Sequence, residues 1–144
     1  MRRLAALVFG LVVAGSASAL DYRSVSEAAL LYDAPSQKAI PLFAIARGTP
    51  VEVVVQLDVW VKVRDSKGDL AWIEKRQLSD KRTVMVRVDR AQVREQADDK
   101  APAVFEAEKD VLLELVEAGP VGWVKVKHRD GQQGFVKAVQ VWGI

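Results

Sequence analysis

The chain has 144 residues, of which 21 are Lys or Arg, 19 are Asp or Glu, one is His and none is Cys. This length allows one domain of ordinary size or two small ones. The absence of Cys excludes a disulfide framework, a thiolate zinc site, a Cys nucleophile and a lipid-modified N-terminal Cys. A single His also excludes a multi-histidine metal site, so most hydrolytic chemistry lacks its usual side chains.

The first segment has the pattern of a secretory signal peptide. Arg2 and Arg3 precede an uncharged apolar run over residues 4–14, and the small residues Ala-Ser-Ala follow at 17–19. The apolar run is roughly half of the ~20 residues that a membrane-spanning helix needs. We therefore expect cleavage after Ala19 rather than an uncleaved anchor, and a periplasmic or secreted location. No second run of spanning length follows, so no stable membrane insertion of the mature chain is expected.

Cleavage would change the charge of the chain. Removing residues 1–19 leaves 125 of the 144 residues and takes away Arg2 and Arg3 but no acid. The 21 cations fall to 19 and then equal the 19 acidic residues. Because nucleic-acid binding depends on a surplus of positive charge, a neutral mature chain predicts no nucleic-acid partner.

The mature chain consists of two copies of one unit. The segment 60–63 (Trp-Val-Lys-Val) recurs at 123–126, an offset of 63 residues, whereas upstream segments such as 51–54 recur at an offset of 62. The offset changes near Gly119-Pro120, where a turn accepts an extra residue at little cost. Two copies of about 60 residues are therefore expected.

Each copy is predicted to consist of short strands. In the first copy, residues 51–57 and 59–64 are rich in β-branched residues, and Ser-Lys-Gly-Asp at 66–69 indicates a hairpin turn before a returning strand. The second copy has Asp130-Gly131 at the equivalent turn. No mature segment has a sustained helical period, and residues 101–109 come nearest to one. Short strands at close spacing predict an all-β fold of small antiparallel barrels.

The order of these motifs resembles the bacterial SH3-like domain family. The first copy shows Gly-Thr-Pro-Val-Glu-Val at 48–53, Trp-Val-Lys-Val at 60–63, Gly68, Ala-Trp-Ile at 71–73 and a closing Leu78. The resemblance covers nearly the whole mature chain and is closest to the tandem, secreted subgroup. It implies two five-stranded barrels that bind peptides or cell-wall components without catalysis. We place a signal peptide at 1–19, one SH3-like domain at 20–79 and a second at 80–144.

The two copies depart from the family pattern at different positions. The Arg that the family usually carries after its first core strand is kept as Arg94 in the second copy and replaced by Tyr32 in the first. The second copy has Asp110 where the first has Gly48, and Asp tolerates left-handed backbone geometry better than most residues. A Tyr often found before the final core residue is Gln77 in one copy and Gln140 in the other.

Strand alternation places several aromatic side chains on the outer face. Val61 and Val63 are expected to face the core, so Trp60 faces outward beside Lys62 and Arg64. An outward aromatic surface suits a peptide groove. Alternatively, these side chains cover a barrel end or the contact between copies. The candidate ligand-binding residues are Tyr32, Trp60, Trp72, Arg94, Trp123 and Phe135. Trp142 is interpreted as a packing residue near the C-terminus.

His128 offers little for catalysis. It stands beside a hairpin turn without an evident Ser or Cys partner, and we expect a solvated loop histidine. Basic residues across the junction are expected to keep an exposed strand edge soluble or to touch an anionic wall polymer. They are Lys81, Arg82, Arg87, Arg90 and Arg94.

The leading hypothesis is a noncatalytic periplasmic protein without a cofactor or metal. It would bind an extended peptide, a peptidoglycan stem or an envelope protein in an aromatic-lined groove. The alternative is a structural or regulatory accessory subunit of an envelope complex, whose aromatic surface is covered by its partner. A hydrolase would need side chains that the Cys and His counts do not supply. Oligomeric state, ligand identity and the use of one or both copies stay open.

Overall fold

The structure is a computed structural model that describes residues 20–144. The expected signal peptide lies outside the described residues. The described part is all-β, and its regular elements are strands and two short 3-10 helices, which confirms the predicted fold class. None of the helices among residues 20–144 has the length and apolar character needed to cross a membrane.

The first copy folds as one seven-stranded antiparallel sheet, here called barrel one. Its order is β3-β2-β6-β5-β4-β1-β7, so β3 and β7 are the edge strands. A 3-10 helix, η1 (Lys75–Gln77), joins the last two strands. The strands are β1 (Tyr22–Val25), β2 (Ala29–Tyr32), β3 (Pro41–Ile45), β4 (Pro50–Gln56), β5 (Trp60–Arg64), β6 (Leu70–Glu74) and β7 (Leu78–Ser79).

The second copy, barrel two, repeats this arrangement. Its sheet has the equivalent order β10-β9-β13-β12-β11-β8-β14, and η2 (Ala138–Gln140) corresponds to η1. The segment with the nearest approach to a helical period contains strand β10 instead. The strands are β8 (Thr83–Val86), β9 (Arg90–Arg94), β10 (Ala103–Glu108), β11 (Leu112–Ala118), β12 (Trp123–Lys127), β13 (Gln133–Lys137) and β14 (Val141–Trp142).

Seven strands in each sheet exceed the five that the family resemblance implied. The hairpin of β2 and β3 lies at one edge of the first sheet, because β3 pairs with β2 alone, and β10 likewise pairs with β9 alone. β7 and β14 at the other edge are only two residues long. The additional strands therefore lie at the margins of each sheet.

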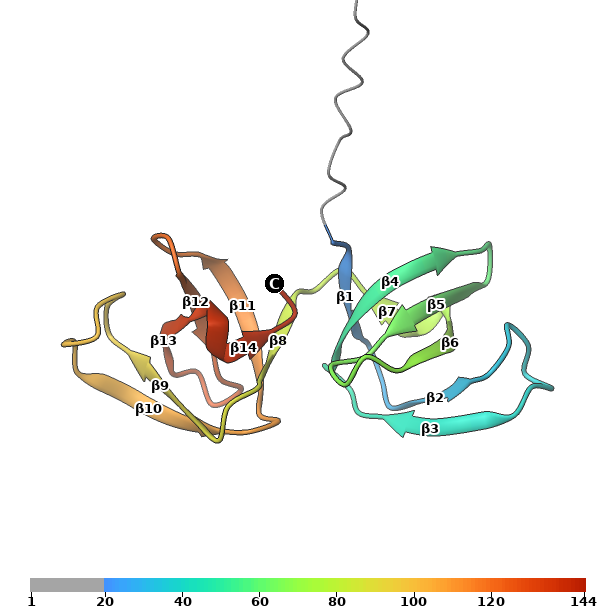
Figure 1. Ribbon diagram of the computed structural model, residues 1–144, viewed down its shortest axis with the longest axis horizontal. Helices are drawn as coiled ribbons and strands as arrows, with labels where there is room; N and C mark the ends of the chain where they lie inside the picture. Colours follow the sequence, from blue (N-terminus) through green and yellow to red (C-terminus); the bar gives the residue numbers. More distant parts are fainter. Residues whose placement is uncertain (1–19) are drawn as a thin grey trace, which may run out of the picture.

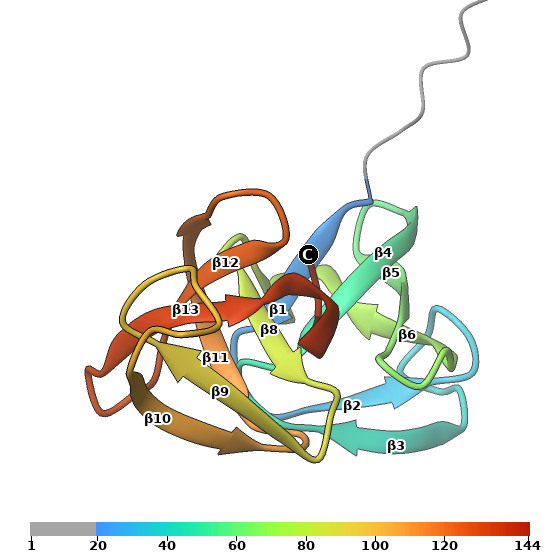
Figure 2. The ribbon, with the colours of Figure 1, turned by 60° about the vertical axis from the view of Figure 1, so that its left-hand side comes forward.

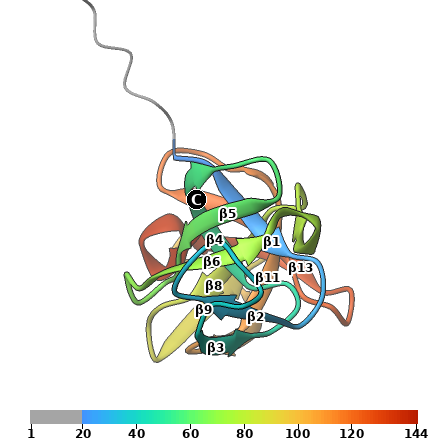
Figure 3. The same cartoon turned by 90° about the vertical axis from the view of Figure 1, so that its right-hand side faces the viewer.

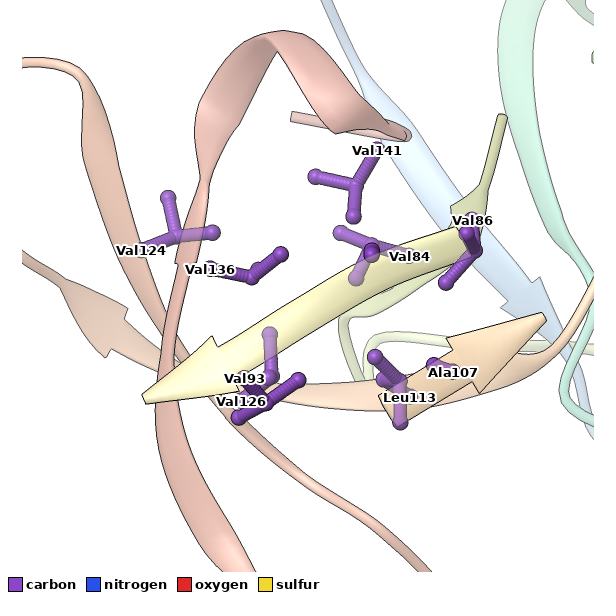
Figure 4. Close-up of a cluster of buried hydrophobic side chains, with 10 residues drawn as sticks. Val84, Val86, Val93, Ala107, Leu113, Val124, Val126, Val136 and Val141 are labelled. Carbon is purple, nitrogen blue, oxygen red and sulfur yellow. The ribbon is translucent and has the colours of Figure 1, made fainter. Parts of the chain in front are cut away.

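Alternation along the strands builds the two cores. Val61 and Val63 are fully buried, whereas Trp60 on the same strand is half-buried. Figure 4 shows the equivalent core of barrel two, where side chains from several strands point toward one another. Each barrel has its own cluster of aliphatic side chains, consistent with a period of two residues on strands such as β5, β9, β12 and β13.

The turns differ between copies where the sequence indicated. Residues 57–59 join β4 to β5, whereas residues 119–122 join β11 to β12, so the extra residue lies in this turn. At the start of β4 and β11, Gly48 has a φ of 82° and Asp110 a φ of 71°. Asp110 is the only residue other than Gly with positive φ between residues 20 and 144. Asp therefore takes the left-handed geometry here.

The two barrels contact each other through the first and last strands. Figures 1 and 2 show the C-terminus between the barrels, beside β1 and β8. The rings of Tyr22 and Trp142 meet edge to face with centroids 5.3 Å apart, and the Thr83 hydroxyl donates to the carbonyl of Gly48 at 2.7 Å. Figure 3 looks along the long axis of this pair, with barrel one in front. Trp142 is thus a packing residue that joins the copies.

Arg82 contacts residues of both copies. Its guanidinium carbon lies 5.5 Å from the centre of the Tyr22 ring, and Nη2 donates to the carbonyl of Gly143 at 2.8 Å. Burial raises the pKa of the Tyr22 hydroxyl, so the phenol stays neutral. The basic stretch was expected to lie along an exposed strand edge. At Arg82 it does not, because this side chain contacts both copies.

Candidate functional site

The six predicted ligand-binding residues form two equivalent groups, one on the outer face of each barrel. Tyr32, Trp60 and Trp72 come from β2, β5 and β6. Arg94, Trp123 and Phe135 come from the corresponding strands β9, β12 and β13. All six are half-buried. The structure brings together the three members of each group through strand pairing.

In barrel one the strand register gathers the aromatic residues. Tyr32 lies opposite Trp72 across β2 and β6, and Trp72 lies opposite Lys62 across β6 and β5. Directly paired residues share a face, as do residues two apart on one strand, so Trp60 belongs to this surface. The Tyr32 and Trp60 rings meet edge to face with centroids 5.6 Å apart. Part of the surface of each ring is therefore covered by the other ring.

A hollow of about 480 Å³ opens beside Tyr32, whereas Trp60 and Trp72 are not among its lining residues. Its wall includes Leu30 and Tyr32 from β2, Ala44 from β3, Gln37 from the loop between them, and Glu74 from the end of β6. Leu30 and Ala44 are exposed and directly paired across the two strands. The hollow thus has an apolar side and a carboxylate, a combination suited to a ligand with both apolar and hydrogen-donating groups.

Glu74 is the buried acid of this site. Its side chain is 11% exposed, and its two oxygens accept hydrogen bonds from Gln37 Nε2 at 2.6 Å and from Arg76 Nε. The hydrogen bond from Gln37, followed by that from Arg76, lowers the pKa of Glu74. Each carboxylate oxygen can accept a second hydrogen bond. Glu74 is therefore an ionised acceptor with capacity left for a ligand.

Barrel two uses the equivalent surface differently. Arg94 Nη1 donates to the carbonyl of Ala101 at 2.8 Å and so holds the loop between β9 and β10. Lys137, at the position of Glu74, pairs with Asp99 at 2.8 Å, and this bond lowers the pKa of Asp99. The Lys137 ammonium also lies 6.0 Å from the centre of the Trp123 ring. The predicted residues Arg94 and Trp123 thus take part in internal polar contacts.

Two further positions distinguish the barrels. Gln92 and Glu106 stand where barrel one has Leu30 and Ala44, and they are hydrogen-bonded at 2.6 Å. The Lys125 ammonium lies 6.0 Å from the centre of the Phe135 ring. The surface of barrel two is therefore more polar and more internally paired than that of barrel one.

The sequence reasoning missed the residues that make the hollow in barrel one, namely Leu30, Gln37, Ala44, Glu74 and Arg76. Two of these residues, Gln37 and Glu74, could have been found by comparing the sequences of the two copies. Gln37 and Glu74 of the first copy correspond to Asp99 and Lys137 of the second. Both copies join the loop to the end of the same strand, but the charge at that strand end is reversed.

His128 is more enclosed than a solvated loop residue would be. Its side chain is 28% exposed, Nδ1 lies 3.1 Å from a carboxylate oxygen of Asp130, and its ring centre lies 5.8 Å from that of Phe105. The backbone N–H of Gln132 is the main cause of the lowered pKa of Asp130, with His128 contributing less. Within residues 20–144, no group of three or more His, Cys, Asp or Glu side chains is placed to hold a metal ion.

The comparison with known families agrees with this geometry. The family model for the bacterial SH3 domain matches the chain twice, over residues 25–80 and 87–143. The chain belongs to the bacterial SH3 domain family. The resemblance seen in the sequence is thereby confirmed, and the two bacterial SH3 domains correspond to barrel one and barrel two.

Several solved structures are also similar to this chain, at low sequence identity. They include NlpC2 from Trichomonas vaginalis (11% identity, TM-score 0.39, covering 88% of this chain and 49% of that one). An NlpC/P60 family protein from Bacillus cereus has 16% identity and a TM-score of 0.39, with coverage of 84% and 55%. The chain spans about half the length of these structures. No curated protein matches it.

Proposed function

We propose that this protein is a noncatalytic binding module of the cell envelope and that barrel one binds the peptide part of a cell-wall component. The observation that carries the proposal is the hollow lined by Leu30, Tyr32 and the Glu74 carboxylate, with the Trp60 ring packed against Tyr32. Peptide recognition needs a few well-placed polar groups within an otherwise apolar surface. The signal peptide expected at residues 1–19 would deliver the protein to the compartment that contains this ligand.

In this proposal, different residues of the site contact different parts of the ligand. An apolar side chain of the ligand packs against Leu30 and Tyr32, while an amide or amine donates a hydrogen bond to Glu74. Gln37 and Arg76 hold the carboxylate in place before the ligand arrives. Such preorganisation reduces the entropic cost of binding. Barrel two contributes to stability and to the contact between the barrels.

The first prediction concerns Trp60, tested by sedimentation with purified sacculi. We expect Trp60→Ala to lower retention of the protein by about tenfold, because the substitution removes the ring that supports Tyr32 at the hollow. The matched control is Trp123→Ala, the same change at the equivalent position of barrel two, which should retain wild-type binding. No retention of the wild type at low or moderate salt, or equal losses in both variants, would refute wall binding by barrel one.

A second candidate function is an accessory subunit of an envelope complex. The edge strand β3 favours it, because Ile40 just before the strand is 66% exposed and Leu42 within it is 49% exposed. An unpaired strand edge with exposed apolar side chains can add a strand from a partner. Crosslinking in cells distinguishes the two functions, since a subunit would yield one dominant protein and a wall-binding module would yield wall material. Turnover of wall fragments that is lost in His128→Ala would instead indicate a hydrolase.

A further inference from the structure

A second and larger hollow lies between the two barrels. It has a volume of about 820 Å³ and is lined by residues of both copies and of the junction. Arg47 and Gly48 come from the turn before β4, and Lys81 and Thr83 from the junction. The remainder come from β11, from Val111 just before it, and from the hairpin of β12 and β13. It shares no lining residue with the hollow beside Tyr32. We call it the inter-barrel cleft.

The inter-barrel cleft carries a surplus of positive charge. Its lining includes four cations, Arg47, Lys81, Lys127 and Arg129, against a single carboxylate, Glu114. Lys81 pairs with Glu114 at 3.4 Å. Arg47, Lys127 and Arg129 form no ion pair within residues 20–144. Because cations and acids are equal in number over these residues, the surplus is a local property of the cleft.

The floor of the cleft is apolar and held in place. Val111 and Leu112 are half-buried lining residues, and Leu113 is part of the core of barrel two. The hydrogen bond from the Thr83 hydroxyl to the carbonyl of Gly48 joins the two walls at 2.7 Å. β11 is an interior strand that lies between β12 and β8, and Leu112 and Leu113 pair with β8. A ligand must therefore bind through side chains rather than by adding a strand.

We propose that the inter-barrel cleft binds an acidic peptide segment with at least one apolar residue. The guanidinium groups of Arg47 and Arg129 can each bind a carboxylate in a two-point manner, and Lys127 adds a third cation. The apolar floor accommodates a side chain between the carboxylates, which a phosphate polymer lacks. This site is separate from the proposed wall-binding surface and requires both barrels, since Arg47 belongs to one copy and Arg129 to the other.

Fluorescence anisotropy with a labelled dodecapeptide of alternating Glu and Leu tests the second prediction. We expect Arg47→Gln/Arg129→Gln to weaken binding at least about tenfold at low salt, because each Arg loses a charge-assisted contact. The matched control, Lys67→Gln/Lys109→Gln, makes the same change in net charge at another hollow between the barrels and should change affinity less than about twofold. A thermal melt checks that both variants remain folded.

Three results would overturn the proposal. Equal weakening by both double variants would indicate a general electrostatic attraction, and equal binding of a Gln-Leu peptide would exclude carboxylate recognition. Binding of inorganic polyphosphate without binding of the Glu-Leu peptide would assign the cleft to a phosphate polymer. Trp60→Ala should retain binding of the acidic peptide, so failure of wall binding at barrel one and failure of this proposal are distinguishable.

Discussion

At the turn before the fourth strand of each copy, one residue must adopt left-handed backbone geometry. Gly48 does so with a φ of 82°, and Asp110 does so with a φ of 71°. Glycine has no Cβ to clash with the neighbouring carbonyl, whereas any other L-residue has an energetic cost there. The two copies therefore form the same turn with different residues, and the turn with Asp110 has the higher conformational free energy.

The third prediction follows from this position. Asp110→Gly should raise the free energy of unfolding by about 0.5–1 kcal/mol, because the relief of left-handed strain exceeds the added flexibility of the unfolded chain. Urea denaturation measures the change. The reciprocal substitution Gly48→Asp should destabilise by a similar amount, because it introduces the same left-handed strain. Steric overlap adds nothing to this cost, since the atom nearest to a Cβ built there, Leu112 Cδ1, lies at 3.8 Å. A loss of stability in Asp110→Gly would show that the carboxylate has a structural role.

At the scale of the strands, the copies differ in how closely two of them approach. A Cβ added to Gly134 on β13 would lie 2.5 Å from the carbonyl oxygen of Arg94 and 2.8 Å from Val93 Cγ1 on β9. The equivalent residue of barrel one is Ala71, which is buried between β2 and β5 without such a restriction. At this buried position β9 and β13 of barrel two thus leave no room for the methyl group that barrel one accommodates.

The fourth prediction is that Gly134→Ala destabilises the protein by about 1–3 kcal/mol, because the added methyl group must displace backbone. Its matched control is Ala71→Gly in barrel one, which removes one methyl group and should cost about 1 kcal/mol through lost packing and added chain flexibility. Thermal and urea unfolding measure both. If Gly134→Ala has native stability, β9 and β13 can separate without cost and the close approach is not required.

The strands and the cores could be predicted because their signal is local. Alternation about Val61 and Val63 determines which side chains are buried, and the same holds for Val124 and Val126. The hollow in barrel one could not be predicted in this way. Glu74 follows a core residue and has the pattern of an outward-facing charge, but Gln37 from a distant loop folds over it. No periodicity encodes that contact, which depends on how the loop closes.

For the whole molecule, the contact between barrels determines whether there are one or two folding units. A domain of about 60 residues buries a smaller fraction of its surface than a larger domain does and is marginally stable by itself. Tyr22 and Trp142 add an aromatic pair across the contact, and the Arg82 guanidinium lies against the same Tyr22 ring. Arg82 Nε is buried without a hydrogen-bond partner among the described residues, a cost that the other contacts between the barrels must offset.

The fifth prediction is that the two barrels unfold in a single transition that depends on this pair. A double-mutant cycle with Tyr22→Ala and Trp142→Ala should give a coupling of about 0.5–1.5 kcal/mol, the usual range for an edge-to-face aromatic pair. The matched cycle uses Tyr32 and Trp60, which form the same kind of pair within barrel one. Calorimetry of the wild type should show one peak, and two separate peaks or a coupling near zero would contradict the prediction.

The placement of the tryptophans gives the molecule its own optical readout. Of the four tryptophans, Trp60 packs against Tyr32 at the hollow of barrel one, Trp123 occupies the equivalent place in barrel two, and Trp142 lies at the contact between barrels. All three are half-buried, so their emission responds to changes in local polarity. Occupation of one barrel and separation of the two barrels therefore affect different indole rings, and each event can be followed without an external dye.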